Sequence, residues 1–556
     1  MLPLLASIPI LIVGILMIGL LWPSARAMPI GWLSAAVLAY LFWDMPPLWL
    51  LAATLGGAIN TLDILIIVFG ALLILQIMRK SGGIQGISHS MALISTDRRV
   101  QLIIIAWLMG CFLEGAAGFG TPAAVAAPLL VGLGFPPLIA AGATLMADTT
   151  PVTFGAVGVP VWGGLAALEE ITIWPMMING EAVSFAEFLF SIGALAAIIN
   201  FLTGTFIPLA IVALMTKVIG GSFIDGLRVW PVALFGGVVF TLPQVIIANL
   251  IGPELPTLLG ALIGMAIFIP AVKHGFLVPK HKWEFPPHEK WKPNWEGAIK
   301  AGRGEPGGEG KIGPFRAWLP YILLGAILLV ARIPVFRLTP ILRYWDIGWE
   351  QILGTTISRT IQPLYNPGIF PFIFIALLIP LLHKRPFKEV VHAARETVTM
   401  IVPASIALFF TLGMVYILMH SGDAADTDSM LIVLARFAAE YTGAVWYLVA
   451  PFVGILGTFI SGSATVSNIM FGPFQFSTAM QAEVLLVPVL ALQTVGAAAG
   501  NMICIHNVVA ALTTVGLVGK EGIIIKENLP ICLLYGLLAG IVAWVLLIIF
   551  PGSVMF

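Results

Sequence analysis

Long apolar runs follow one another along almost the whole chain, and short polar or glycine-rich segments separate them. A helix of roughly 20 apolar residues crosses the hydrocarbon core of a bilayer, and a helix satisfies its own backbone hydrogen bonds there. Hydrophobic residues make up 59% of the 556 residues and charged residues only 10%. The sequence therefore predicts an all-α polytopic integral membrane protein.

The stretch 110–160 breaks this pattern in the middle of apolar surroundings. It holds two acidic residues, Glu114 and Asp148. It is also dense in residues that interrupt or bend helices, namely Gly115, Gly118, Gly120, Pro122, Thr149, Thr150, Pro151, Gly155, Gly158 and Pro160. Charge and irregular backbone are tolerated at membrane depth where they are buried in protein or line a cavity. We therefore expect this stretch to lie at the functional centre.

A second stretch of the same kind occurs in the other half of the chain. The segment Gly110-Cys-Phe-Leu-Glu-Gly115 is echoed by Gly457-Thr-Phe-Ile-Ser-Gly462. Each is followed by a second run of small and polar residues, Thr149–Gly158 in one half and Thr494–Asn501 in the other. Matching interruptions in two halves of a membrane protein mark the substrate site of many transporters.

The apolar runs and their interruptions predict about 12 transmembrane crossings plus two re-entrant hairpins. The hairpins are expected at about 100–135 and 444–480, and broken helices follow them at 137–167 and 482–518. The other crossings are expected at 2–22, 28–44, 61–79, 187–216, 229–249, 255–272, 317–332, 369–383, 397–420 and 529–550. Short interfacial helices are expected at 47–59, 84–95 and 428–441.

The first hairpin is predicted from the lengths of its arms. The segments 100–114 and 121–133 flank the glycine cluster. At 1.5 Å per residue they reach about 22 and 20 Å, which is short of a hydrocarbon core of about 30 Å. We therefore expect both arms to enter and leave on the same side.

The order of these elements predicts two inverted-topology repeats. Residues 1–216 form the first repeat, 217–272 a connecting helix pair, 273–316 a hydrophilic linker and 317–556 the second repeat. Lys and Arg gather in cytoplasmic loops. If the basic residues near 79–80 and 98–99 lie in the cytoplasm, the linker lies in the cytoplasm too, and both termini lie outside. The exception is an external loop that carries Arg337, Arg343 and Arg359.

The predicted hairpin tips and broken helices would aim helix N-termini at one cavity. Free N–H groups and the helix dipole bind anions without a cationic side chain, and the interrupted stretches contain no Lys or Arg. The predicted substrate-binding residues are Gly118, Thr121, Thr149, Thr150, Ser461, Ser463, Thr465, Ser467, Asn468, Asn501 and His506. Each has a structural alternative: hydroxyls bond to their own helix, glycines allow close packing, and the histidine is a packed polar group.

Glu114 and Asp148 are the predicted proton-coupling residues. A low-dielectric interior disfavours an ionised carboxyl group, so that Glu114 could exchange a proton close to neutral pH. A neutral Glu114 beside a bound carboxylate would avoid two adjacent negative charges, which couples the two ligands. The alternative role of Glu114 is to cap exposed backbone amides at the hairpin tip.

Four segments resemble the bacterial L-lactate permease family. They are FLEGAAGFGTPAAV at 112–125, FISGSATVSNIMFGPFQ at 459–475, GNMICIHNVVA at 500–510 and VGLVGKEG at 515–522. The resemblance implies a secondary transporter of the cell (inner) membrane that takes up L-lactate, D-lactate and glycolate by proton symport. At wider range the layout resembles an ion-transporter superfamily with elevator-type transport and scaffold domains, which allows a homodimer. Ala464 stands where many relatives carry Asn or Asp, so the substrate range could differ.

Other function classes remain open at this point. A sodium-coupled carboxylate symporter would use unwound backbone carbonyls as Na⁺ ligands, and a channel would conduct continuously. The sequence shows no metal-ligand cluster, nucleophile elbow or nucleotide-binding loop, so we expect no enzyme, no cofactor and no metal site. The 27 basic and 27 acidic residues balance, so no nucleic acid partner is expected.

Overall fold

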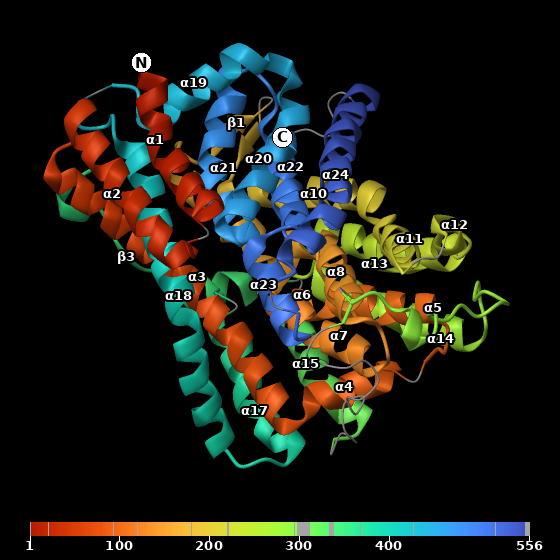
Figure 1. Cartoon of the computed structure of the whole chain (residues 1–556). Coiled ribbons are helices and arrows are strands. Elements are labelled where there is room, and N and C mark those ends of the chain that lie inside the picture. The colour runs from red at the N-terminus through yellow and green to blue at the C-terminus, as the bar shows by residue number, and fades with distance from the viewer. Residues whose placement is uncertain are drawn as a thin grey trace.

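The computed structural model describes residues 2–20, 22–92, 94–118, 120–178, 181–219, 222–293, 295–296, 312–332, 338–366, 368–425, 427–517 and 519–550. Helices dominate this part of the chain (Figure 1), and 11 of them are long and apolar enough to cross a membrane. The predicted crossings lie on these helices except 2–22 and 369–383, which coincide with shorter apolar helices. The additional long helix, Arg98–Ala117, is the first arm of the predicted hairpin.

The first half of the chain forms the following elements in order. They are α1 (Leu2–Gly14), η1 (Ile15–Gly19), α2 (Ser24–Phe42), α3 (Pro47–Ser81), α4 (Gly83–Ala92), α5 (Arg98–Leu102), η2 (Ile103–Met109), α6 (Gly110–Ala117), α7 (Thr121–Gly132), α8 (Pro137–Ala147), η3 (Thr150–Phe154), α9 (Gly155–Trp162), η4 (Ala166–Glu170), β1 (Met176–Ile178), β2 (Glu181–Val183), α10 (Phe185–Gly204), α11 (Ile207–Val218), α12 (Phe223–Leu227), α13 (Trp230–Leu250) and α14 (Pro256–Lys273).

The second half continues in the same way. Its elements are η5 (His288–Lys290), α15 (Pro314–Arg332), α16 (Leu338–Leu342), β3 (Ile347–Trp349), η7 (Ile352–Gly354), β4 (Arg359–Ile361), η8 (Gly368–Ile373), α17 (Phe374–His383), α18 (Lys388–His420), α19 (Met430–Thr442), η9 (Gly443–Val445), α20 (Trp446–Ser461), α21 (Ala464–Gln481), α22 (Leu486–Gly500), α23 (Ile505–Thr514) and α24 (Glu521–Ile549).

The two halves repeat one order of elements. A helix of 35 residues, α3, precedes the short α4, the first hairpin and the first broken helix. A helix of 33 residues, α18, precedes α19, the second hairpin and the second broken helix. Figure 1 places α20 and α21 in the upper part of the molecule and α6, α7 and α23 below them. The inverted repeats, the domain boundaries, the elevator movement and the external termini stay predictions.

Two short antiparallel β-hairpins add to the predicted all-helical fold. Strands β1 and β2 pair Met176 with Val183, and strands β3 and β4 pair Ile347 with Ile361. Both hairpins lie in loops that the sequence analysis placed outside the membrane. Water there can satisfy the free edges of such short strands, which the bilayer core cannot do.

The helix α3 corrects one sequence expectation. Residues 47–59 were predicted as an interfacial helix separate from a crossing at 61–79, but α3 is continuous from Pro47 to Ser81. Gly57 lies in its middle because α18 approaches it closely: a Cβ atom on Gly57 would lie 2.7 Å from the backbone nitrogen of Gly413. The glycine therefore marks a helix–helix contact and not the end of a helix.

This contact gives a test of the packing between α3 and α18. Gly57→Ala should destabilise the protein by about 1–3 kcal/mol, because backbone and not a flexible side chain occupies the space. The measurement is thermal unfolding in detergent, followed by the loss of monodisperse protein. Gly142→Ala is the matched control, since no heavy atom lies within 4 Å of a Cβ at Gly142. Equal stability of the two variants would contradict the close contact.

The first arm of the first hairpin is longer than predicted. This arm continues to Ala117, whereas the sequence analysis ended it at Glu114 because a glycine cluster follows. Gly115 lies inside the helix, where a Cβ atom would meet the backbone nitrogen of Leu258 at 2.6 Å, so it allows α6 to contact α14. The chain turns back after Ala117, and α7 packs against α6.

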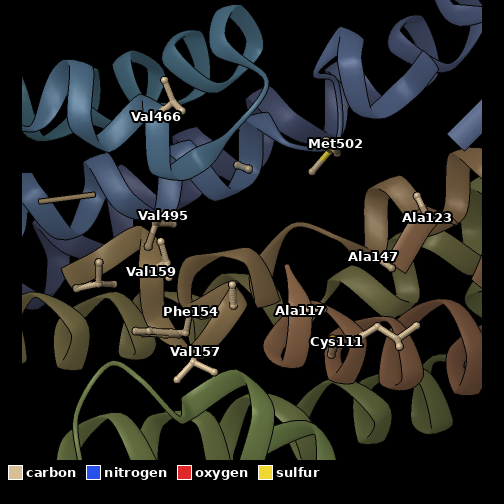
Figure 2. Close-up of a cluster of buried hydrophobic side chains, with 14 of the residues drawn as sticks. Cys111, Ala117, Ala123, Ala147, Phe154, Val157, Val159, Val466, Val495 and Met502 are labelled. Atoms are coloured by element: carbon tan, nitrogen blue, oxygen red, sulfur yellow. The ribbon is translucent and has the colours of Figure 1, made fainter. Parts of the chain in front are cut away.

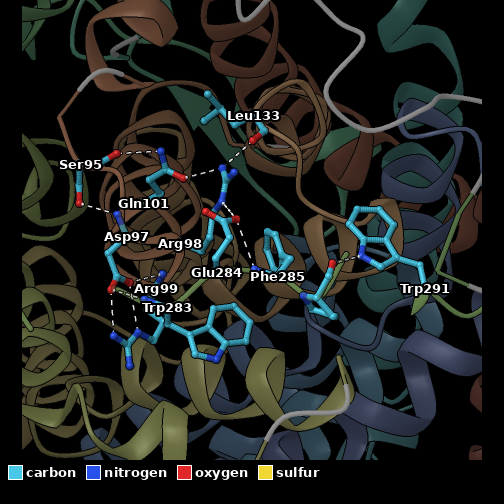
Figure 3. A network of polar contacts seen from close by, with 11 residues as sticks. Ser95, Asp97, Arg98, Arg99, Gln101, Leu133, Trp283, Glu284, Phe285 and Trp291 are labelled. Carbon is cyan, nitrogen blue, oxygen red and sulfur yellow. Dashed lines mark hydrogen bonds and ion pairs between the residues drawn. The ribbon is translucent and has the colours of Figure 1, made fainter. Parts of the chain in front are cut away.

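The first part of the predicted linker packs against the base of this hairpin (Figure 3). Arg98, at the start of α5, donates to the carbonyl of Leu133 beyond α7 (2.6 Å) and pairs with Glu284 of the linker (2.6 Å). Asp97 and Arg99 form a buried ion pair (2.9 Å) beside the same segment. The linker residues 297–311 lie outside the described residues, so their predicted position is not addressed by the structure.

Burial explains in part why the predicted external loop carries three arginines. Arg359 of β4 is 6% exposed and pairs with Glu169 of η4 (2.9 Å). Arg343 lies over the ring of Tyr365, 4.3 Å from its centroid. Arg337 falls outside the described residues. The positive-inside rule describes cations that stay in solvent near the membrane, and a cation paired in the protein interior is not one of these.

Candidate functional site

The tips of both hairpins lie against the first turn of α23. Gly120, with φ of 73°, ends the first tip, and a Cβ atom there would lie 3.3 Å from Oδ1 of Asn507. Gly462, with φ of 84°, forms the second tip, and a Cβ atom there would lie 2.9 Å from Nδ1 of His506. Glycine adopts such positive φ angles without steric cost. Two neighbouring residues of α23 thus contact two hairpins from different halves of the chain.

Both broken helices open next to these tips. After α8, residues Asp148 and Thr149 are not helical, and inside α9 the residues Ala156, Val157 and Gly158 have positive φ angles. In the second half, residues 501–504 separate α22 from α23. Gly118, with φ of 63°, lies against Ala156, so the first tip also contacts the kink of α9.

Glu114 and Asp148 form a buried pair of carboxyl groups. Glu114 is 3% exposed and Asp148 is 1% exposed, and their side chains lie next to each other. Glu114 Oε2 and Asp148 Oδ1 accept no hydrogen bond from any N–H or O–H donor that the structure describes. Two carboxyl groups in contact need a proton that both share. Gly155 makes room for the pair, because a Cβ atom there would lie 2.2 Å from Glu114 Oε1.

Two asparagines connect this pair to α23. Nδ2 of Asn501 donates to Oδ2 of Asp148 (2.7 Å) and to its backbone carbonyl (3.2 Å). Nδ2 of Asn507 donates in turn to Oδ1 of Asn501. A residue of the first broken helix is therefore held by a residue of the second, 353 positions away in the sequence.

Buried apolar side chains from both halves form a cluster in this part of the molecule (Figure 2). Ala117, Ala147 and Phe154 come from the first half, and Val466 and Met502 come from the second. All five are buried. Such surroundings strengthen electrostatic interactions and leave few partners for a charge, so the arrangement suits the exchange of a proton and the binding of a small anion.

The predicted threonines of the first half are mostly bonded within the protein. The hydroxyl of Thr121 donates to the carbonyl of Gly118 (2.8 Å) and so closes the hairpin tip. The hydroxyl of Thr149 donates back to Met146 (2.6 Å). Thr150 hydrogen-bonds with the hydroxyl of Tyr535 on α24 (3.3 Å). Thr149 thus bonds back to the preceding helix, as the structural alternative predicts, whereas Thr150 bonds to another helix.

In the second half, the predicted residues divide into two groups. Ser461 and Ser463 lie at the hairpin tip, where Ser463 accepts from the backbone N–H of Val466 and caps α21. Ser467 donates to the carbonyl of Gly454 (2.9 Å), and Asn468 donates to the carbonyl of Pro160 (2.7 Å). Ser467 and Asn468 therefore join helices to one another. Thr465 is buried in the first turn of α21.

Several buried polar residues escaped the sequence analysis. Gln493 of α22 donates to Ser467 (3.2 Å) and Asn468 (3.3 Å), and Gln475 of α21 donates to Gln493 (2.9 Å). Asn507 was noted near the second break but was not assigned to the site. A side-chain amide inside an apolar run destabilises the folded protein unless it is hydrogen-bonded. An Asn or Gln within such a run is therefore the sequence signal that would have marked these residues.

Comparison with known proteins agrees with this architecture. A family model described as L-lactate permease matches residues 3–550. The L-lactate permease of Bacillus subtilis is 30% identical, over 92% of this chain and 89% of that protein. The glycolate permease GlcA of Escherichia coli is 28% identical, over 87% of this chain and 85% of its own length. An L-lactate permease of Escherichia coli is 28% identical, over 97% and 94%. The chain belongs to the L-lactate permease family, a family of transporters and not of enzymes.

Proposed function

We propose that this protein is a secondary active transporter that takes up L-lactate and related small 2-hydroxy monocarboxylates, such as D-lactate and glycolate, together with protons. The names of the relatives support this substrate class, because they include L-lactate permeases and a glycolate permease. The hairpin tips of both halves, which meet at α23, support a single central binding site.

The observation that carries the proposal is the carboxyl pair of Glu114 and Asp148. Two carboxyl groups buried side by side repel each other when both are ionised, so in this proposal the pair holds a shared proton while no anion is bound. A substrate carboxylate entering the same space adds a negative charge, and the interrupted stretches contain no Lys or Arg to balance it. Protonation of the pair lowers this repulsion, so each ligand favours the binding of the other.

The substrate carboxylate would be held by helix N-termini. Helices α7, α21 and α23 begin at Thr121, Ala464 and Ile505, next to the two tips. The first backbone N–H groups of a helix lack partners within the helix and bind anions well. His506 adds a side chain at the second tip, where its buried Nδ1 has no hydrogen-bond partner among the described residues.

Sodium coupling is the competing proposal for the same site. It would use backbone carbonyls at the helix breaks, but the carbonyl of Asp148 already accepts a hydrogen bond from Asn501. The carboxyl pair, by contrast, is a ready acceptor for a second proton. Proton coupling is therefore the better supported mechanism.

Uptake into proteoliposomes tests the proposal. With an acidic exterior, an alkaline interior and no sodium, L-lactate should accumulate above its external concentration, and a protonophore should abolish the accumulation. A sodium gradient at equal pH should drive none. Accumulation that follows sodium and ignores pH would refute proton coupling. Failure to transport lactate or glycolate under either gradient would refute the substrate class.

A further inference from the structure

A chain of four polar side chains runs from the first hairpin to α23. Glu114 lies next to Asp148, Asn501 donates to Asp148 (2.7 Å), and Asn507 donates to Asn501. The last atom of this chain is Oδ1 of Asn507, which faces the tip of the first hairpin at Gly120. This series of polar side chains therefore connects the carboxyl pair to the surface of the proposed binding site.

Asp148 sets the direction of every hydrogen bond in this chain. A carboxylate oxygen without a proton is an acceptor, so Asn501 must turn its NH₂ group toward Oδ2 of Asp148. The carbonyl oxygen of Asn501 then accepts from the NH₂ group of Asn507. Asn507 is left with its carbonyl oxygen at the hairpin tip. That oxygen accepts no hydrogen bond from any residue that the structure describes.

We propose that Oδ1 of Asn507 accepts the hydrogen bond of the substrate 2-hydroxyl group, and that Asp148 orients this acceptor through Asn501. The inference rests on the proposed function, because it assigns a further contact within the same site. Asn507 is then a specificity-determining residue that touches the substrate. Asn501 is a positioning residue.

The position of Asn507 fits this role. It follows His506 in the first turn of α23, so a carboxylate held by the N–H groups of that turn lies within a short distance of its side chain. In a 2-hydroxy acid the hydroxyl is attached to the carbon next to the carboxylate, which matches this spacing. A 2-oxo acid would instead place an acceptor against the Asn507 oxygen, which leaves both without a donor.

A binding panel on the purified protein tests the proposal independently of transport. L-lactate and propionate differ in the 2-hydroxyl group, and so do glycolate and acetate. Competition of each acid against radiolabelled L-lactate should show that the wild type prefers the hydroxy acid by about tenfold or more, the expected size for one buried hydrogen bond. Asn507→Leu, which keeps the side-chain volume, and Asn507→Ala should reduce this preference to within about twofold.

The matched control is Asn249→Ala. Asn249 donates to its own helix α13 and is exposed, so its loss should leave the preference unchanged. A folded Asn507 variant that keeps the wild-type preference would refute the role of Asn507 and leave the proposed function intact. A wild type that binds neither L-lactate nor glycolate would refute both proposals.

A second variant tests whether Asp148 orients the side-chain amide of Asn507. This test does not depend on whether the Asn507 variants fold. Asp148→Asn can present an NH₂ group to Asn501, which allows both amides to reverse and Asn507 to offer a donor. The preference for L-lactate over pyruvate should then fall by about tenfold. An unchanged ratio in a folded Asp148→Asn protein would refute the orienting role. A purely structural role of Asp148 would lower the binding of both acids without altering their ratio.

Discussion

Glu114→Gln should abolish the accumulation of L-lactate that a pH gradient drives. A pH difference of one unit supplies 1.36 kcal/mol per proton, enough for about tenfold accumulation if one proton accompanies each lactate. Glutamine fills the same space and can donate to Asp148, but it cannot take up or release a proton. The accumulation ratio should therefore fall from about ten to about one at this gradient. Exchange of lactate down its own gradient should be kept in part.

A comparison of two assays distinguishes a role of Glu114 in proton coupling from a purely structural role. Accumulation is measured in proteoliposomes with a pH step, and exchange is measured with equal pH and labelled lactate on one side. Glu187→Gln is the control, because Glu187 is an exposed acid that caps α10 and glutamine can replace it there. If a stable Glu114→Gln protein still concentrated lactate, Glu114 would have no part in coupling. Loss of both activities in a folded protein would assign Glu114 to substrate binding instead.

The second large effect is expected at Arg359. This arginine is 6% exposed and joins β4 to η4 through Glu169 (2.9 Å), with Glu170 at 3.9 Å. Glu170 also accepts from the hydroxyl of Tyr416 on α18 (2.6 Å). The cluster therefore ties the end of the first broken helix to the long helix of the second half. Glu169 is 51% exposed and Glu170 is 11% exposed, so removing the cation leaves Glu170 with Tyr416 but without Arg359.

Arg359→Met should lower the free energy of unfolding by about 1.5–3 kcal/mol, which is the usual contribution of hydrogen bonds to a charged group. Thermal unfolding in detergent measures this loss. Arg436→Met is the matched control: Arg436 pairs with Asp428 at 2.7 Å, but the two side chains are 59% and 42% exposed. An exposed pair contributes about 0–1 kcal/mol. Similar shifts for the two variants would show that burial does not decide the strength of the Arg359 pair.

The sequence by itself determined the course of the helices. The length of an apolar run fixes whether it can cross a bilayer, and this property is local, so most predicted crossings coincide with observed helices. The hairpin tips were also predicted from a local property, namely the glycines that interrupt the apolar runs. Glycine permits the positive φ angles that Gly118, Gly120 and Gly462 adopt. Glu114 and Asp148 were identified because a charge at membrane depth is costly wherever it occurs.

The tertiary structure alone decided which polar residues meet. Asp148 and Asn501 are 353 residues apart, and no local pattern links them. Helical periodicity places residues three and four apart on one face, but contacts between distant segments depend on how the helices pack. The same reason explains why Ser467 and Asn468 are bonded to other helices, and why Gly57 marks a contact instead of a helix end. Helix packing thus brings polar residues from both halves into one series of contacts from Glu114 to Asn507.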